Sequence, residues 1–174
     1  RRTVVAKRLR LGKVFEAADL FDAAEDQYRQ AATQDKNFRF ELASFLARQG
    51  ETQEAVQLCR EIATKNNIRT ICTLIFNAIL SQPQKVPAAD MKQLSEWIEL
   101  AKSEHPDDWK IRTQEAFLLD LGGKTAEAIV LLDEMKWEKL SEYERGMVAN
   151  NRAYFNLKLG NNDEAISSDL EIAF

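Results

Sequence analysis

The stretch LGKVFEAADLFDAAEDQYRQA, residues 11–31, contains a glycine inside a segment whose other residues favour helix. A glycine in a helix interior costs roughly 1 kcal/mol relative to alanine, so Gly12 indicates that another part of the chain comes close to the backbone there. Alanines and aromatic residues recur at helical intervals through the rest of the stretch. The pattern predicts two helices that cross at small side chains.

Three other stretches share a second pattern, and each follows a glycine: ETQEAVQLCREIA (51–63), KTAEAIVLLDEM (124–135) and NNDEAISSDLEIA (161–173). The glycine ends one helix and Glu-Ala opens the next, as in a helix hairpin. One position recurs along the chain as Ala24, Ala55, Leu94, Ala128 and Ala165, at intervals of 31, 39, 34 and 37 residues. This internal repeat predicts an all-α fold of about ten helices.

A repeat of this length with two helices per unit resembles the tetratricopeptide repeat, whose signature is W-x2-L-G-x2-Y, then A-x3-F, then proline. Leu11-Gly12 with Phe15 matches the first helix of such a repeat, and Ala24 with Tyr28 matches the second. In this family small residues lie where the helices of one hairpin cross, so the resemblance places Gly12 against Ala24.

The resemblance implies an α-solenoid of about five antiparallel helix hairpins stacked in a right-handed superhelix. It covers residues 1–174 as a single domain, which we expect to be a fragment of a longer chain. The expected units are residues 1–35, 36–66, 67–106, 107–139 and 140–174.

The match to the family pattern weakens after the first unit. The third unit contains QPQKVP, in which Pro83 and Pro87 exclude helix. In the fifth unit, Asn156 stands where an aromatic residue is usual and Asp169 where phenylalanine is usual. These polar residues predict a frayed or truncated end, or a face that awaits further helices.

Capping signals support the same division of the chain. Ser141 and Glu144 form a capping-box pattern at the start of the fifth unit. Pro87 suits the first turn of a helix, and Asp107 with Asp108 places negative charge where the fourth unit begins.

Composition excludes several classes of function. The net charge of -4 argues against a nucleic-acid partner. The first thirteen residues contain six basic residues and no acid, which indicates either an anionic partner or a solvated helix face. Cys59 and Cys72 lack the close pairing of a zinc site and are expected to be core thiols. No apolar run is long enough for membrane insertion and no secretory signal is evident, so we expect a cytoplasmic protein.

Catalytic motifs are missing from the sequence. The single histidine, His105, precedes Pro106 in an expected turn, and GGKT (122–125) lacks the earlier glycine and the strand of a phosphate-binding loop. We therefore expect no enzyme activity, no metal and no cofactor. The three tryptophans, Trp97, Trp109 and Trp137, are expected to anchor packing.

The resemblance implies a binding scaffold, because tetratricopeptide domains hold a peptide or partner helix on the concave side that their first helices line. The register transfers the following binding residues to this chain: Lys13, Phe40, Arg48, Lys110, Gln114, Phe117, Asn150, Asn151 and Tyr154. It also places Leu9, Glu16, Glu41, Ser44, Thr113, Met147 and Lys158 on this side.

Asn151 matches an asparagine that binds extended peptides in some family members. Glu41 and Ser44 replace the amides of a carboxylate clamp, so we do not expect a C-terminal carboxylate as ligand. The expected partner is a protein or peptide. The alternative is an assembly segment of a larger protein, including a homo-oligomer.

Overall fold

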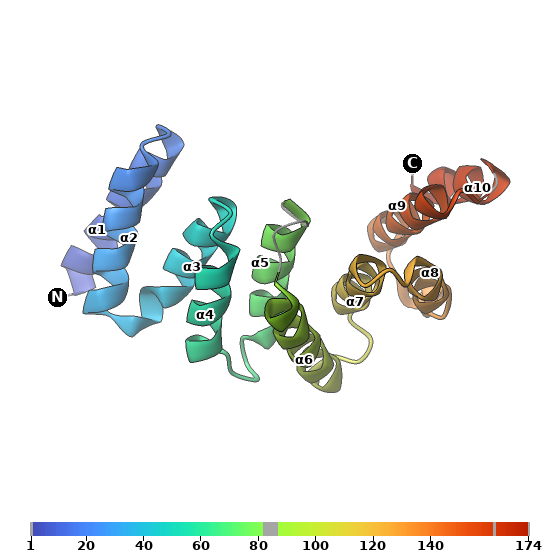
Figure 1. Cartoon of the computed structure of the whole chain (residues 1–174), viewed down its shortest axis with the longest axis horizontal. Helices are drawn as coiled ribbons and strands as arrows, with labels where there is room; N and C mark the ends of the chain where they lie inside the picture. The colour runs from blue at the N-terminus through green and yellow to red at the C-terminus, as the bar shows by residue number, and fades with distance from the viewer. Residues whose placement is uncertain (1, 82–86, 162, 174) are drawn as a thin grey trace. The chain divides into compact units, whose positions relative to one another are not determined.

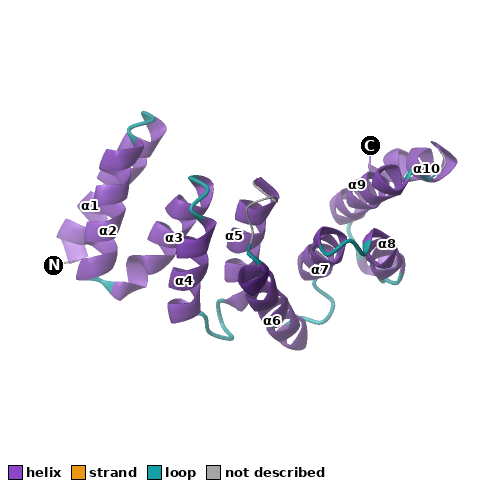
Figure 2. Cartoon of the chain, in the orientation of Figure 1, coloured by secondary structure: helices purple, strands orange, loops and turns teal. Residues whose placement is uncertain are grey.

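The computed structural model describes residues 2–81, 87–161 and 163–173, which form α-helices and short 3-10 turns without a strand (Figure 2). The ten α-helices of these ranges confirm the predicted all-α fold. They are α1 (Arg2–Ala17), α2 (Phe21–Gln34), α3 (Arg39–Arg48), α4 (Thr52–Ile62), α5 (Ile68–Ser81), α6 (Ala88–Glu104), α7 (Trp109–Leu121), α8 (Thr125–Asp133), α9 (Glu142–Leu159) and α10 (Asp163–Ala173) (Figure 1).

A short 3-10 segment at Lys36–Phe38 connects α2 to α3, and another at Trp137–Lys139 connects α8 to α9. Pro87 directly precedes α6, one residue before the first turn in which it was expected, and its carbonyl accepts a hydrogen bond from the Asp90 amide at 3.0 Å. The predicted break at Pro83 lies outside the described residues, and so does the side chain of Ala165.

The predicted punctuation between the helices of a pair is confirmed. Gly50, Gly123 and Gly160 have φ of 83°, 78° and 69°, the left-handed conformation that glycine adopts without a Cβ clash. The GGKT segment thus marks the end of α7 and the start of α8. In the first hairpin the equivalent position is Asp19, whose φ of 56° makes it the non-glycine residue with positive φ in the described chain.

Side-chain caps are also found where the sequence predicts them. Ser141 and Glu144 form a capping box, in which the Glu144 carboxylate accepts from the Ser141 amide at 2.9 Å. Asp108 caps α7 by accepting a hydrogen bond from the Lys110 amide at 2.9 Å. These bonds satisfy amides that have no partner inside the helix.

The helices divide into two compact units, Arg1–Asp90 and Met91–Phe174. In the first unit α1 packs on α2, α2 on α3, and α3 on α4, and α5 packs against both α3 and α4. Its core contains Ala24 and Ala55 of the recurring position together with Ala43 of α3, all fully buried. Cys59 and Cys72 are buried free thiols, as predicted, and burial raises the pKa of each to about 12.

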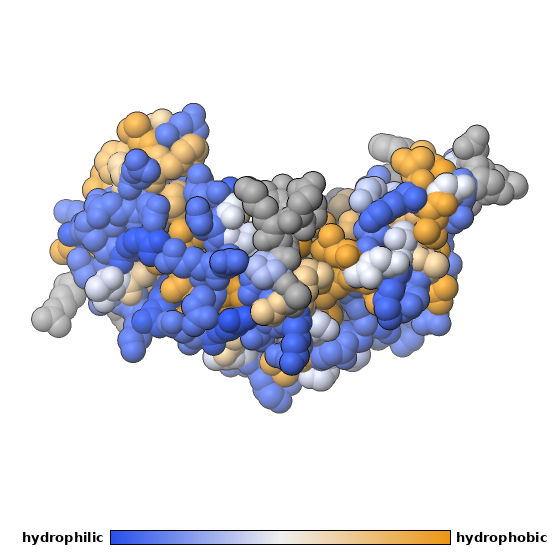
Figure 3. Space-filling view, viewed as in Figure 1, coloured by the Kyte–Doolittle hydropathy of each residue, from blue (hydrophilic) through white to orange (hydrophobic). Residues whose placement is uncertain are grey.

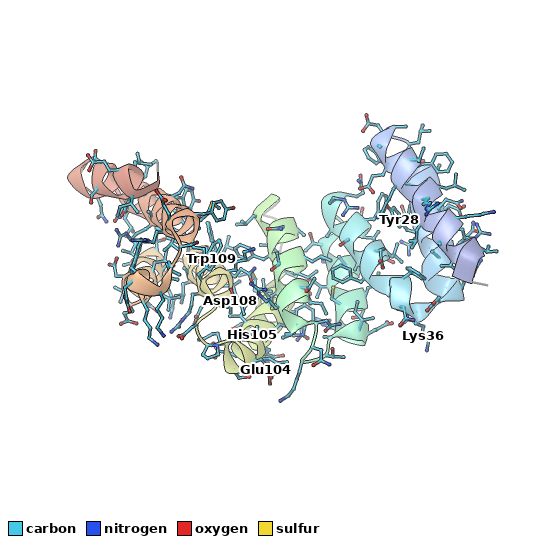
Figure 4. All side chains as sticks on the ribbon, turned by 180° about the vertical axis from the view of Figure 1, so that it is seen from behind. Tyr28, Lys36, Glu104, His105, Asp108 and Trp109 are labelled. Carbon is cyan, nitrogen blue, oxygen red and sulfur yellow. The ribbon has the colours of Figure 1, made fainter. Side chains whose placement is uncertain are left out.

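Gly12 faces the ring of Tyr28. A Cβ built on Gly12 would lie 3.2 Å from the ring of Tyr28, which is itself buried and stacks on Phe45 with 5.0 Å between ring centroids (Figure 4). The predicted close approach is confirmed, and its nearest atoms belong to the Tyr28 ring, one turn after Ala24, which fills the space that the glycine leaves.

In the second unit α7 packs on α8, α8 on α9, and α9 on α10. A buried cluster of Ala116, Ala128, Leu132, Val148 and Phe155 forms part of its core, and Trp109 and Trp137 pack against this cluster. The expected packing role of these tryptophans is thereby confirmed, and Trp97 is buried in α6 as well.

The fifth hairpin contains a buried polar network in place of the usual aromatic contact. Arg152 Nε donates to Asp169 Oδ1 at 2.7 Å, and Asn156 Nδ2 donates to Asp169 Oδ2 at 3.0 Å. Asn161 donates to the Asn156 side chain at 2.6 Å. The expected frayed end is therefore wrong: Asn156 and Asp169 are buried and bind α10 to α9, because each polar group has a partner within the hairpin.

Candidate functional site

Helix α9 exposes large apolar side chains along one face. Tyr143, Met147, Tyr154 and Leu157 are between 38% and 71% exposed. Together with the exposed Asn150, they are spaced 4, 3, 4 and 3 residues apart and so share one helix face over about 21 Å. We call these five residues the α9 stripe. Figure 3 shows apolar surface over the C-terminal hairpin of α9 and α10.

A cluster of aromatic rings packs against the core side of this stripe. Phe117 of α7 is half-buried, and its ring centroid lies 5.9 Å from that of Tyr154 and 4.9 Å from that of the buried Phe155. Tyr154 therefore lies at the border between the core and solvent, and its backbone belongs to a packed helix. A ligand on the stripe would meet a pre-ordered surface, which limits the entropy lost on binding.

The charge at the edge of the stripe is already paired. Lys158 Nζ donates to both carboxylate oxygens of Asp120 at 2.8 and 2.9 Å, and Thr125 donates to the same carboxylate at 2.6 Å. The hydrogen bonds with Asp120 raise the pKa of Lys158. Lys158 thus fastens α9 to α7.

The other predicted residues of this unit differ in their access to solvent. Lys110 is exposed, with Nζ 5.5 Å from the centroid of the Trp109 ring, and Asn151 is half-buried. Gln114 is only 4% exposed because α7 packs against both α8 and α9. Gln114 therefore offers little surface to a ligand, contrary to the place that the register gave it.

In the first unit the predicted binding residues form an ion pair with each other. Arg48 of α3 donates to the Glu16 carboxylate of α1 at 2.7 and 3.0 Å, and the Tyr28 hydroxyl donates to it at 2.9 Å. Burial by itself would raise the pKa of Glu16, but the hydrogen bonds from Arg48 and Tyr28 outweigh it and lower that pKa. Lys13 is exposed and Phe40 is half-buried.

Tyr143 and Leu157 were missed by the sequence prediction. The family register places binding residues relative to an alanine in each repeat, and it gave Met147, Asn150 and Tyr154 but not the two ends of the stripe. The 4-3-4-3 spacing of these residues in the sequence was a sufficient signal, since it is the spacing of a helix-packing seam.

A cleft of about 370 Å³ lies at the start of α7 and is lined by Trp109, Arg112, Met135, Lys136 and Lys139 among others. Asp107 accepts hydrogen bonds from Lys136 and Lys139 at 3.2 Å each, and these bonds lower the pKa of Asp107. Figure 4 shows Glu104, His105 and Asp108 following one another where α6 connects to α7. His105 is exposed in this connection.

The described ranges contain no group of three or more histidine, cysteine, aspartate or glutamate side chains placed to hold a metal ion. Among their helices, none combines the length and the apolar character needed to cross a membrane.

The sequence matches no protein-family model and no curated protein. The structure is similar to that of TTC0263, described as a thermophilic TPR protein of Thermus thermophilus, with a TM-score of 0.63 and 18% identity over 97% of this chain and 91% of that chain. It is also similar to the structure titled MamA MSR-1 C2, with a TM-score of 0.60 and 18% identity over 97% and 94%. The chain therefore has a tetratricopeptide-like fold, an all-α solenoid of helical hairpins.

Proposed function

We propose that the chain is a non-enzymatic scaffold that binds a helical segment of a protein partner along the α9 stripe. The observation that carries this proposal is the run of exposed apolar side chains at a 4-3-4-3 spacing. A helix at a protein surface normally turns a polar face to solvent. Four large apolar residues on the solvent-facing side of α9 are therefore typical of a surface that contacts another protein.

The spacing of the stripe indicates the conformation of the partner. A seam parallel to the axis of one helix is complementary to a second helix lying alongside it, whose apolar residues follow the same period. Asn150 is in the middle of this seam. A partner helix would place a polar side chain opposite Asn150, because a buried amide without a hydrogen bond weakens association. Fold similarity to tetratricopeptide proteins supports a role in protein recognition.

The other predicted binding residues have secondary parts in this proposal. Phe117, Lys110 and Asn151 belong to the same unit as the stripe, and we expect them to extend its surface. Lys13, Phe40 and Arg48 belong to the first unit, where a separate segment of the partner would contact them. We expect an affinity of about 1 μM for one such surface, roughly -8 kcal/mol.

The proposal is tested with a photo-crosslinking amino acid at position 150 and a matched one at Val130, an exposed residue of α8. We expect position 150 to capture one or a few proteins through a defined segment that position 130 does not capture. A synthetic peptide of that segment is then titrated against the wild type and Tyr154→Ser/Leu157→Ser. Phe117 is unsuitable for this variant, because its ring packs on Phe155 and its removal would destabilise the unit.

Binding of the peptide to the wild type, with a gain in helical circular dichroism and at least tenfold weaker binding to the double variant, supports the proposal. Val130→Ser serves as the control and is expected to bind as the wild type does. Equal capture at both positions, or equal affinity for the double variant, would exclude the stripe as the binding surface.

A further inference from the structure

The cleft at the start of α7 has an apolar lining that the core of its unit holds in place. Its volume of about 370 Å³ is within the range of about 300–1,000 Å³ that is usual for ligand pockets. The apolar part of the lining consists of Pro106, Trp109, Met135 and Leu140. Trp109 and Met135 pack against the buried cluster of α7, α8 and α9. An apolar group of a ligand would therefore meet a pre-formed surface, which limits the entropy lost on binding.

Two lysines of the cleft share a single carboxylate. Lys136 and Lys139, both more than half exposed, each donate to Asp107 at 3.2 Å. Because an ammonium group has three N–H donors, each lysine keeps donors that Asp107 does not use. The pair also carries two positive charges against the one negative charge of Asp107. A second carboxylate that entered the cleft would thus find both hydrogen-bond donors and an excess of positive charge.

Arg112 of α7 is the third basic residue of the lining. It shares the Glu115 carboxylate with Lys102: Arg112 Nη1 lies 3.4 Å from one carboxylate oxygen, whereas Lys102 Nζ lies 2.6 Å from the other. A guanidinium carries five N–H donors, so this one long hydrogen bond leaves Arg112 with donors for a ligand. The cleft therefore has three cations whose pairing inside the chain is incomplete.

The three acidic residues of the lining are Asp107, Glu134 and Glu144. Glu144 belongs to the capping box of α9, where hydrogen bonds from the Ser141 amide and hydroxyl, both at 2.9 Å, lower its pKa. Asp107 is paired with the two lysines. Glu134 is exposed and directly follows α8. Two of the three acids are therefore already hydrogen-bonded within the chain, and Glu134 is the one whose charge opposes the binding of an anion.

We propose that this cleft binds an organic carboxylate that carries a large apolar group, such as an acidic residue next to an aromatic residue in a partner chain. The carboxylate accepts hydrogen bonds from Lys136 and Lys139 in place of Asp107. Arg112 is a further donor, and charge-assisted hydrogen bonds of this kind are stronger than neutral ones. The apolar group packs on Trp109. Asp107 holds the two lysines until the ligand arrives, so it competes with the ligand. The site does not involve the α9 stripe, and either proposal can fail without the other.

The experiment titrates the chain with two carboxylate probes and follows the indole N–H resonance of Trp109 by NMR, which is assigned with Trp109→Phe. Phenylacetate is a free aromatic carboxylate, whereas the dipeptide N-acetyl-Glu-Phe-amide carries its carboxylate on a side chain. The same dipeptide with glutamine in place of glutamate is the uncharged control. We expect both carboxylates to shift the Trp109 resonance until it saturates, and the glutamine peptide to bind about tenfold more weakly than the glutamate peptide.

Variants of the cleft should change the affinity for the carboxylates in opposite directions. Asp107→Asn removes the competitor and is expected to tighten binding about threefold; it spares the cap of α7, which Asp108 provides. Glu134→Gln removes the opposing charge and should tighten binding as well. Lys136→Gln/Lys139→Gln removes two donors and is expected to weaken binding about tenfold. Each changed side chain is exposed, so the helical circular dichroism spectrum should stay unchanged.

Two control variants lie outside the cleft. Lys124→Gln removes an exposed lysine of another ion pair, and Tyr154→Ser/Leu157→Ser alters the α9 stripe; both should bind the probes as the wild type does. Tighter binding of the dipeptide indicates that the carboxylate comes from a partner chain, and tighter binding of phenylacetate indicates a small molecule. A Trp109 resonance that does not shift, equal affinity for the glutamine peptide, weaker binding to Asp107→Asn, or unchanged binding to the double lysine variant would each overturn the proposal.

Discussion

Removing the Asp169 carboxylate is expected to destabilise the hairpin of α9 and α10 strongly. Asp169 is 1% exposed and accepts hydrogen bonds from Arg152 and Asn156. In Asp169→Leu, the Arg152 side chain, which is 19% exposed, keeps Asp133 as its partner at 2.6 Å. Asn156 loses its acceptor in the core.

The expected loss follows from these contacts. Breaking one side of a buried ion pair costs about 3 to 5 kcal/mol, because the other charge stays buried without compensation. Asp133 is half-exposed and still pairs with Arg152 in this variant. The expected loss of stability for Asp169→Leu is therefore near the lower limit, at about 3 kcal/mol. The matched control Asp133→Leu removes only the exposed partner and should cost less than about 1 kcal/mol.

Replacing the whole network should recover most of this loss. Arg152→Leu/Asn156→Leu/Asp169→Leu leaves no buried charge, and such replacements are commonly neutral or stabilising by about 1 to 4 kcal/mol relative to the ion pair. The triple variant loses the contact of Arg152 with the Trp137 ring, at 4.7 Å from its centroid, which is worth about 0.5 to 1 kcal/mol. We therefore expect its stability to lie within about 1 kcal/mol of the wild type.

The assay is urea-induced unfolding followed by tryptophan fluorescence. All three tryptophans of the chain belong to the Met91–Phe174 unit, so their emission reports on the unit that contains the network. A loss of less than about 1 kcal/mol in Asp169→Leu would refute a stabilising role for the buried pair. A triple variant as unstable as Asp169→Leu would show that lost packing, rather than an unpaired charge, causes the loss.

Three further predictions concern the first hairpin and use unfolding followed by circular dichroism. Asp19→Gly should add about 0.5 to 1 kcal/mol because it relieves a positive φ, whereas Asp22→Gly, inside α2, should lose about 1 kcal/mol. Gly12→Leu and Ala24→Leu should each cost about 1 to 3 kcal/mol by overpacking, and no loss at either would contradict the observed packing. Burial and the hydrogen bond to Glu16 raise the pKa of Tyr28 from 10.0 to about 12. The folded state therefore holds the Tyr28 proton more tightly than the unfolded state does. The stability that this provides is complete below pH 10 and is lost as the pH rises through 12, by about 3 kcal/mol at most. The Tyr28→Phe variant should lack this loss.

Local patterns in the sequence were sufficient to predict the helices and their ends. Glycine at a helix end, Glu-Ala at the next start and a capping box each act through neighbouring backbone groups, so their effect does not depend on the rest of the fold. Gly123, Gly160 and Ser141 accordingly have the conformations that the sequence predicts. The resemblance to tetratricopeptide repeats extended these local signals to a correct fold class.

Predictions that depended on long-range partners were less accurate. Asn156 and Asp169 each depart from the family pattern, and taken singly a polar residue at a core position indicates a defect. Arg152 makes them compatible with the core, but it is 17 residues from Asp169 and was not predicted to be its partner. Gln114 was placed on a binding face by register alone, although packing of α7 against two helices buries it.

Binding at the α9 stripe is expected to depend on apolar contact more than on charge. Four of the five stripe residues are large apolar side chains, and Lys158 at the edge of the stripe is already paired with Asp120. Salt screens exposed charges over about 10 Å at 0.1 M ionic strength, whereas apolar contact does not weaken in this way. Raising the salt concentration should therefore leave the affinity for the partner peptide nearly unchanged. An affinity that falls steeply with added salt would show that charges, rather than the apolar stripe, hold the partner.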